Sequence, residues 1–166
     1  VCRRRRCRLW AWVGLWGAGC YRYNSRTDRF AHMPFDASRV GNGLSTSTTL
    51  PDSTIWSFYE DSQKNFWLGT HSSGLVKFDR DTNLYTRYVA SNDPTSLSNN
   101  IVWTIYEDSQ NRLWVGTAGG LSLMDRENGS FKRFQADDRQ SNGLLNNSIL
   151  SMRIAKSFKM RIDSIG

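Results

Sequence analysis

The chain has 166 residues, of which 39% are hydrophobic and 13% aromatic, a composition that is typical of a folded domain and unlike that of a disordered chain. Its net charge of +7 lies at the two ends: residues 1–8 contain five Arg, residues 153–166 contain four basic residues and one acidic residue, and residues 9–152 carry a net charge of −1. A nucleic-acid surface needs cations spread over the fold, so this distribution argues against nucleic acid as a partner.

The N-terminal region fits two interpretations. Four consecutive Arg at residues 3–6, followed by an apolar run, resemble a secretory signal. However, Trp12-Val13-Gly14 recurs 55 residues later as Trp67-Leu68-Gly69, and the similarity continues beyond the apolar run. Because a signal peptide would not preserve that pattern, the repeat favours a partial structural unit over residues 9–49. Its last part, residues 33–49, is rich in Ser, Thr and Gly and predicts a surface loop.

Two full copies of one pattern follow. Residues 55–70 (IWSFYEDSQKNFWLGT) and residues 102–117 (VWTIYEDSQNRLWVGT) are identical at nine of sixteen positions and lie 47 residues apart. A further copy begins at Asn146–Met152, which resembles Asn99–Ile105, and the similarity then ends. The shift to a basic composition indicates that residues 153–166 are a truncated or frame-shifted tail, and the Arg-rich composition of residues 1–8 indicates that this segment is not native either.

Each copy contains four short runs of β-branched and aromatic residues, separated by turn residues. In the second full copy the predicted strands are Ile101–Tyr106, Leu113–Gly116, Leu121–Met124 and Phe131–Phe134. Four short antiparallel strands in a unit of this length predict one blade of a β-propeller, so the fold class is all-β.

The predicted organisation is an Arg-rich segment at 1–8, a partial blade at 9–49, complete blades at 50–96 and 97–143, the first strand of another blade at 144–152, and a divergent tail at 153–166. Closed propellers have at least four blades. About three blades therefore predict an open arc whose end faces expose apolar groups, so that the fragment is marginally stable or self-associates.

The blade motif consists of eight recurring positions: Asp61, Trp67, Gly69, Thr70, Asp108, Trp114, Gly116 and Thr117. We expect the Trp side chains to lie between neighbouring blades, where large aromatics bury much apolar area. The Gly residues allow another backbone to approach, and the Asp carboxylates accept N–H bonds at the start of a hairpin turn. The Thr residues suit a strand end beside a Gly-rich turn.

We expect ligand contacts in the segments that differ between blades, chiefly the loops that lead into the first strand of each blade. These loops open at the mouth of the central channel, and their polar residues are the candidate ligand-binding residues: Ser98, Asn99, Asn100, Asn146 and Asn147. Their alternative role is to turn the chain between blades.

The sequence predicts no catalytic, metal or cofactor site. It contains no Ser-His-Asp arrangement and no phosphate-binding loop, and His32 and His71 have no partner at ligand spacing. The three cysteines, Cys2, Cys7 and Cys20, form no CxxC pair and no even disulfide framework. The Glu-Asp pairs of the repeat occupy adjacent strand positions, which point to opposite faces and do not form a catalytic dyad.

The segments YEDSQKNFWLGTHSSGL and YEDSQNRLWVGTAGGL resemble the two-component regulator propeller repeat, and FDRDTNLYTRY, MDRENGSFKRF and SLSNNIV are similar to later parts of that repeat. The resemblance implies a bacterial sensor blade on the periplasmic or extracytoplasmic side of the inner membrane. It also implies a carbohydrate-type ligand, and a parent protein that supplies the missing blades, the membrane attachment and a histidine kinase or diguanylate cyclase output domain. The chain itself is then expected to be non-catalytic.

Two alternative functions are also compatible with the sequence. A protein-interaction scaffold propeller would carry its own blade signature, and no Trp-Asp dipeptide closes a blade here. A piece of a propeller enzyme, such as a lyase or glycosidase, would need a catalytic residue in the channel, and the blades differ too little to reveal one.

Overall fold

The computed structural model describes residues 10–36, 45–137 and 144–152. The predicted segments at 1–8 and 153–166 lie outside these residues. Among these residues the only regular secondary structure is the β-strand. The strands are β1 (Trp10–Gly14), β2 (Cys20–Asn24), β3 (Arg29–Met33), β4 (Ser45–Ser47), β5 (Ile55–Glu60), β6 (Phe66–Thr70), β7 (Leu75–Asp79), β8 (Leu84–Tyr88), β9 (Val102–Glu107), β10 (Leu113–Thr117), β11 (Gly120–Met124) and β12 (Phe131–Phe134).

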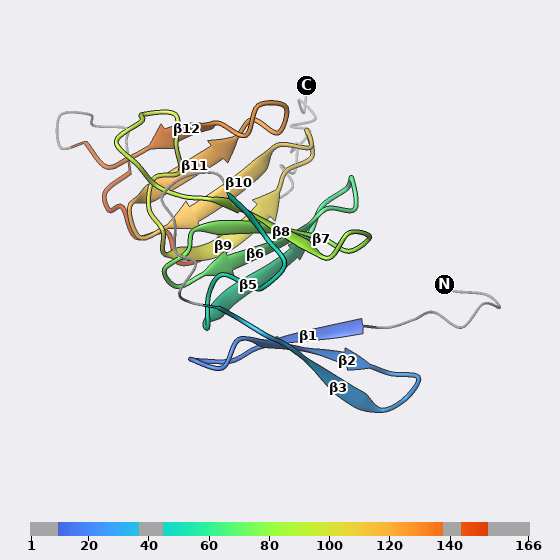
Figure 1. Cartoon of the computed structure of the whole chain (residues 1–166). Helices are drawn as coiled ribbons and strands as arrows, with labels where there is room; N and C mark the ends of the chain where they lie inside the picture. The colour runs from blue at the N-terminus through green and yellow to red at the C-terminus, as the bar shows by residue number, and fades with distance from the viewer. Residues whose placement is uncertain (1–9, 37–44, 138–143, 153–166) are drawn as a thin grey trace, which may run out of the picture.

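Three antiparallel sheets follow one another along the chain (Figure 1). Their strand orders are β1-β2-β3, then β4-β8-β7-β6-β5, then β12-β11-β10-β9. Apart from β4, every sheet is a meander in which each strand pairs with the next one in sequence. The predicted all-β fold of antiparallel blades is confirmed; the sheets have three, five and four strands, and the four strands predicted in the second full copy correspond to β9–β12.

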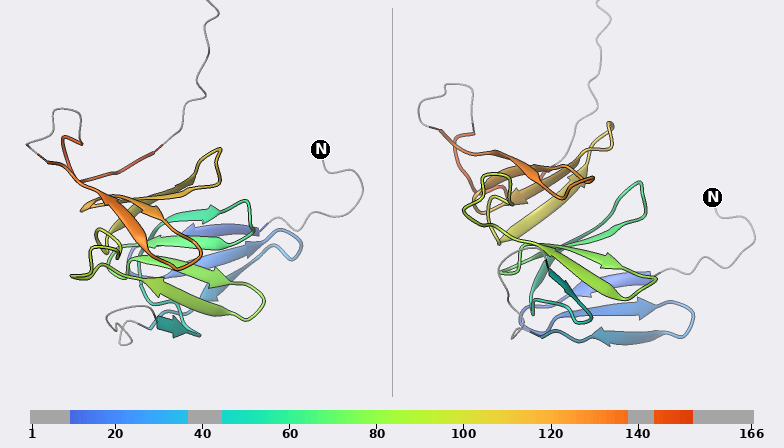
Figure 2. Two further views of the ribbon diagram at one scale, coloured as in Figure 1. Left: turned by 90° about the horizontal axis from the view of Figure 1, so that it is seen from above. Right: turned by 45° about the horizontal axis from the view of Figure 1, so that its top comes forward.

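The sheets are stacked face to face and fan outward from β5 and β9, which lie at the edge where the second and third sheets meet (Figure 2). The stacking explains the burial of β6, all five residues of which are buried, because this strand has a sheet on each side. In contrast, β3 is almost entirely exposed, because it is the edge strand of the first sheet that lies farthest from the second sheet, which β1 contacts through β5. The arc of three sheets is open over the described residues.

Alternate residues of the second sheet face opposite neighbours. Phe66 and Leu68 pack with Cys20 of the first sheet, whereas Trp67 packs with Val102 and other residues of the third sheet. This alternation is the two-residue period of a strand, used here to build two cores from one sheet. Each core is therefore an interface between blades, and a blade separated from its neighbours would lose the contacts on both faces.

Two segments differ from the sequence-based expectation. Residues 33–49, predicted as a loop, contain β4, whose three residues pair with the outer edge of β8 from Ser45↔Arg87 to Ser47↔Tyr85. Residues 144–152, predicted as a first strand, form no strand, although Ile149 donates its N–H to the Thr117 carbonyl at 2.9 Å. A strand needs a ladder partner, and the hairpin that would provide one is missing from the described residues.

Each sheet is closely approached, at a glycine, by the chain segment that follows it. A Cβ added to Gly69 would lie 2.9 Å from the Val102 carbonyl oxygen, and one added to Gly116 would lie 2.8 Å from that of Ile149. Gly14 stands in the same relation to Ile55, at 2.5 Å. The first segment of each blade thus rests on the Gly of the preceding blade, and no larger residue fits there.

Candidate functional site

The predicted ligand-binding residues of the loop before β9 are engaged in hydrogen bonds within the protein. Asn99 Oδ1 accepts the Ile101 N–H at 2.8 Å, and Asn100 Oδ1 accepts the Ala90 N–H at 2.7 Å. Ser98 Oγ lies 2.8 Å from Thr117 Oγ1. These contacts fix the chain where it passes from one blade to the next, which is the alternative role considered for this loop.

The second candidate loop repeats the arrangement. Asn146 Oδ1 accepts the Ser148 N–H at 2.7 Å, and Asn147 Oδ1 accepts the Ala136 N–H at 2.6 Å. The side-chain oxygens of both Asn pairs are therefore used by the fold. The loop before β9 lies at the end of the sheets where the β6–β7 and β10–β11 turns also lie.

Asp52 occupies the position equivalent to Asn99 one blade earlier, and its side chain accepts more backbone hydrogen bonds than that of Asn99. Its Oδ1 accepts the Thr54 N–H at 2.9 Å, while Oδ2 accepts the N–H groups of Ser72 and Ser73 at 2.7 and 2.9 Å. The side chain is only 4% exposed. A carboxylate that satisfies three backbone donors in a buried turn is a structural group, although nothing in the sequence distinguishes it from a ligand-binding Asp.

Asp61 links the turn after β5 to the blade core. Its Oδ1 accepts the Gln63 and Asn65 N–H groups at 3.0 and 2.8 Å, and its Oδ2 accepts the indole N–H of Trp67 at 2.8 Å. Burial alone would raise the pKa of Asp61, but the bonds from Trp67 and Asn65 outweigh it and hold that pKa below its usual value. The carboxylate is therefore charged and satisfied, and is unavailable as an acid or base.

Asp108 repeats these contacts in the next blade. It accepts the N–H groups of Gln110 and Arg112 at 2.9 and 3.0 Å and the indole N–H of Trp114 at 2.9 Å. Burial raises its pKa, whereas these bonds and the Arg112 guanidinium lower it further than burial raises it, so the pKa lies far below the usual value. Two blades thus share one arrangement of carboxylate, turn and tryptophan.

An ion-pair network joins the second and third sheets at their turn ends. Arg126 donates to Glu107 at 2.6 Å and also lies 3.4 Å from Asp61 of the preceding blade. Glu107 in turn accepts the Ser62 N–H at 2.7 Å. Arg80 donates to Glu60 at 2.6 Å in the same way, but both of those side chains are considerably exposed. The network therefore becomes buried only where a neighbouring blade covers it.

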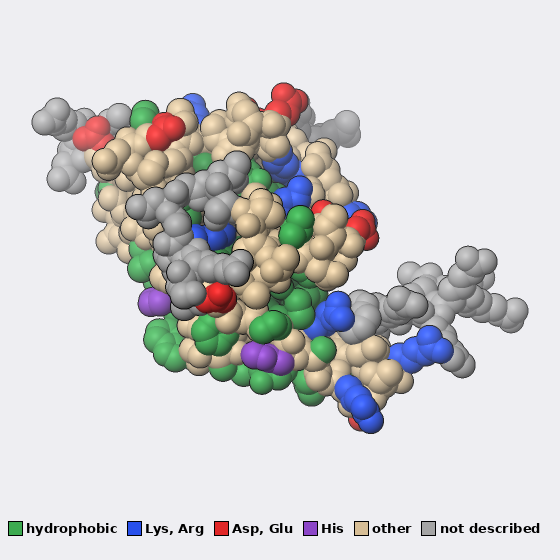
Figure 3. Space-filling view, viewed as in Figure 1, with side chains coloured by type: hydrophobic (Ala, Val, Ile, Leu, Met, Phe, Trp, Pro, Cys, Tyr) green, Lys and Arg blue, Asp and Glu red, His purple; other side chains and the backbone are tan. Residues whose placement is uncertain are grey.

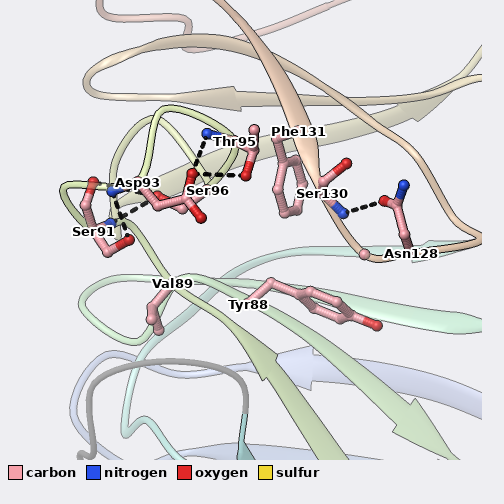
Figure 4. A pocket seen from close by; sticks show the side chains of 10 residues that line it. Tyr88, Val89, Ser91, Asp93, Thr95, Ser96, Asn128, Ser130 and Phe131 are labelled. Atoms are coloured by element: carbon pink, nitrogen blue, oxygen red, sulfur yellow. Dashed lines mark hydrogen bonds between the residues drawn. The ribbon is translucent and has the colours of Figure 1, made fainter.

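A pocket of about 300 Å³ lies between the outer strands of the second and third sheets (Figure 4). Tyr88 and Phe131, whose rings meet edge to face with centroids 6.1 Å apart, line it together, and the loop after β8 contributes hydroxyl groups and Asp93. Asp93 accepts the Thr95 N–H and hydroxyl at 2.8 and 2.7 Å, bonds that lower its pKa. Aromatic walls with polar groups at the rim are the usual composition of a small-ligand pocket.

A second candidate lies at the inner edge, where four aromatic rings meet. Trp56 contacts Trp16 and Trp103, with ring centroids 5.2 and 5.0 Å apart, and His71 lies 5.5 Å from Trp16. We call Trp16, Trp56, Trp103 and His71 the aromatic ladder. Sequence reasoning identified none of them as a site residue, although the 47-residue spacing of Trp56 and Trp103 was a visible signal.

Within the described ranges no group of three or more His, Cys, Asp or Glu side chains is placed to hold a metal ion. Cys20 is buried with a free thiol, and burial raises its pKa to about 11. No helix among these residues is long and apolar enough to cross a membrane.

Residues 49–72 and 96–119 match the model of the two component regulator propeller. Each match begins in the loop before a blade and ends in the turn after its second strand. The chain carries two component regulator propeller repeats. The predicted family is thereby confirmed, and the Asp, Trp, Gly and Thr positions described above lie inside these repeats.

The propeller fold is also supported by solved structures. The chain resembles the extracellular domain of BT4673 from B. thetaiotaomicron, described in one structure as a one component system and in another as a hybrid two component system. The TM-scores are 0.62 and 0.63, with 21% sequence identity in both cases. The similarity covers 84% and 85% of this chain but only 17% of those domains. No curated protein sequence matches the chain.

Proposed function

We propose that the chain is a ligand-sensing, non-catalytic part of a propeller on the extracytoplasmic side of the membrane, in a signal transduction protein. The observation that carries the proposal is the tandem pair of two component regulator propeller repeats at residues 49–72 and 96–119. The fold shared with an extracellular domain of a two component system supports the same assignment.

The placement of the polar groups supports the non-catalytic part of the proposal. The carboxylates of Asp52, Asp61 and Asp108 are each used by several N–H donors. A general acid or base needs a proton-transferring group that is free to reach a substrate. The remaining blades, the membrane attachment and a histidine kinase or diguanylate cyclase output domain would be supplied by the parent protein.

Sensing by such a module requires that a ligand favour one arrangement of the blades over another. The pocket lined by Tyr88 and Phe131 and the aromatic ladder both draw residues from more than one sheet. A ligand bound at either place would therefore respond to the angle between blades, and would transmit its binding to whatever those blades contact.

The purified chain tests the proposal directly. Thermal melting is measured with panels of neutral and acidic oligosaccharides, amino acids and nucleosides, and the recovered ligands are analysed for chemical change. We expect a saturable rise in melting temperature with one class and no conversion, because a ligand that binds only the folded state stabilises it. Turnover of ATP, GTP or any oligosaccharide, or the absence of stabilisation by every class, overturns the proposal.

A further inference from the structure

Two tryptophans leave the regular strand ladder at matched positions of successive blades. Between β5 and β6, Ile55 pairs with Thr70 and Ser57 with Gly69, so Trp56 is the extra residue of a bulge. Between β9 and β10 the pairs are Val102 with Thr117 and Thr104 with Gly116, which leaves Trp103 as the extra residue. A bulge redirects the side chain of the extra residue, and bulges are enriched beside active sites.

The redirected rings belong to the aromatic ladder, which extends over all three sheets. Trp16 comes from the β1–β2 turn, Trp56 from β5 and Trp103 from β9. Successive ring centroids are 5.2 and 5.0 Å apart, within the range of favourable aromatic contacts. Figure 3 shows hydrophobic side chains gathered beside a histidine at the left edge of the molecule, over the β1–β2 turn. The ladder is therefore a continuous apolar surface.

The ladder is open to solvent, unlike the tryptophans of the blade interfaces. Trp16 is 72% exposed and Trp56 36%, whereas Trp67 is only 2% exposed. Leu150, at the matching repeat position 47 residues after Trp103, is also exposed, at 66%. Large contiguous apolar surfaces are rare on proteins unless something binds there. Two successive bulges that bring Trp rings to such a surface indicate a binding role.

The ladder also contains unsatisfied polar atoms. Trp103 Nε1 and His71 Nδ1 are buried atoms with no hydrogen-bond partner. Leaving such atoms unpaired costs free energy, and a ligand recovers it only if the rings that cover these atoms move and expose them. The four side chains carry no carboxylate and no ammonium group, so they favour an uncharged ligand. The combination suits a ring with a flat apolar face and hydrogen-bonding groups at its edge.

We propose that the aromatic ladder binds an uncharged ring-bearing ligand, which stacks on the exposed rings of Trp16 and Trp56. Sugar rings and aromatic heterocycles share this chemistry. The inference rests on the proposed sensor function and names the site that would serve it. A ligand that bridges Trp16 and Trp103 contacts the first and third sheets at once, so its affinity depends on how the blades are arranged.

Titration calorimetry with the whole chain tests the site with two sets of probes. One set contains neutral pentasaccharides of glucose, mannose, galactose, xylose and arabinose, and the other contains adenosine, cytidine and indole. Oligogalacturonate and AMP serve as charged counterparts. We expect saturable binding by members of one neutral set and at least about tenfold weaker binding by the matching charged probe, because a charge must be desolvated on an apolar surface.

Variants of the ladder locate the binding. Trp16→Ala and Trp56→Ala should each weaken the affinity at least about tenfold, the usual consequence of losing one stacking ring. Trp16→Phe should retain more affinity than Trp16→Ala, since it keeps a flat apolar face. Phe30→Ala is the matched control, because Phe30 is another exposed aromatic, 62% exposed, on β3 and outside the ladder. Melting curves verify that each variant is folded.

The outcomes separate the site from the function. Saturable binding that survives both Ala variants overturns the ladder as the site and leaves the sensor proposal standing. Equal binding of charged and neutral probes, or no binding by any neutral probe, also overturns the ladder. Chemical conversion of a bound probe overturns the sensor proposal itself.

Discussion

Asp61 shows how one side chain joins a turn, a core and a neighbouring blade. It is 2% exposed and accepts N–H bonds from the turn and from the indole of Trp67, and it faces Arg126 of the next blade. The sequence predicted the turn contacts, because a short carboxylate at the start of a hairpin accepts the N–H groups that follow it. It did not predict the Arg126 contact, since a contact across 65 residues depends on how the sheets stack.

Removing the Asp61 carboxylate should destabilise the folded chain. We expect Asp61→Ala to lower the free energy of unfolding by about 1–3 kcal/mol, because buried donors, including the Trp67 indole, lose their acceptor. Urea unfolding followed by far-UV circular dichroism measures the loss. Asp79→Ala is the matched control, since Asp79 also accepts two turn N–H groups but is exposed. Equal losses for the two variants would show that burial and the indole bond contribute nothing.

The same carboxylates predict how stability depends on pH. The pKa values of Asp61, Asp108 and Glu107 are lowered in the folded chain, so the folded state binds fewer protons than the unfolded state. Their stabilisation is complete above the unfolded values of about 4 and is lost as the pH falls through the lower folded values. Urea midpoints measured from neutral to acidic pH should fall, and less steeply in Asp108→Asn. A midpoint that rises on acidification contradicts this assignment.

At the scale of the strand, regular elements were predictable and departures from regularity were not. The strands of the third sheet follow from short β-branched and aromatic runs between turn residues. The bulges at Trp56 and Trp103 leave no mark in that pattern, because they appear only when two strands are paired. β4 was missed for a related reason: its Ser and Thr residues attach to β8 through the backbone, without an apolar face.

The packing of β6 against β9 predicts that a side chain at residue 69 would destabilise the blade interface. A Cβ at residue 69 would lie 2.9 Å from both the Cγ1 and the carbonyl oxygen of Val102, and the carbonyl oxygen, a backbone atom, cannot move without shifting β9 away from β6. We expect Gly69→Ala to cost about 1–3 kcal/mol of unfolding free energy. Gly116→Ala is the control at the same repeat position. It should cost less, because its backbone neighbour Ile149 belongs to a segment that forms no strand. A larger loss for Gly116→Ala would contradict this view of the interface.

At the scale of the whole molecule, the candidate site also could not be predicted from the sequence. The polar loops were predicted as ligand contacts, yet the oxygens of Asn99 and Asn100 are used by the fold. The aromatic ladder was not predicted, because Trp at a repeated position reads as interblade core, as it is for Trp67. Only the stacking of three sheets distinguishes the tryptophans that face a neighbouring blade from those that face solvent.

The outer face of the third sheet shows what an open arc leaves exposed. A groove of about 400 Å³ lies there, lined by Trp114, Tyr106 and Leu121 together with Asp108 and Met152. On the second sheet the corresponding tryptophan, Trp67, is covered by the third sheet and is buried. The groove is therefore the half of a blade interface that no sheet of the described residues covers, and its apolar area favours association.

We expect the purified chain to self-associate through this groove as its concentration rises, which sedimentation velocity would show as a shift to faster species. Leu121→Lys places a charge in the groove and should move the chain towards the monomer, because the ammonium group would have to be desolvated on association. Leu145→Lys is the matched control, since Leu145 is 99% exposed and does not line the groove. A wild-type chain that stays monomeric at every concentration and melts in one cooperative transition would mean that the three sheets are stable without a fourth. The blade interfaces would then contribute more to stability than the exposed groove costs.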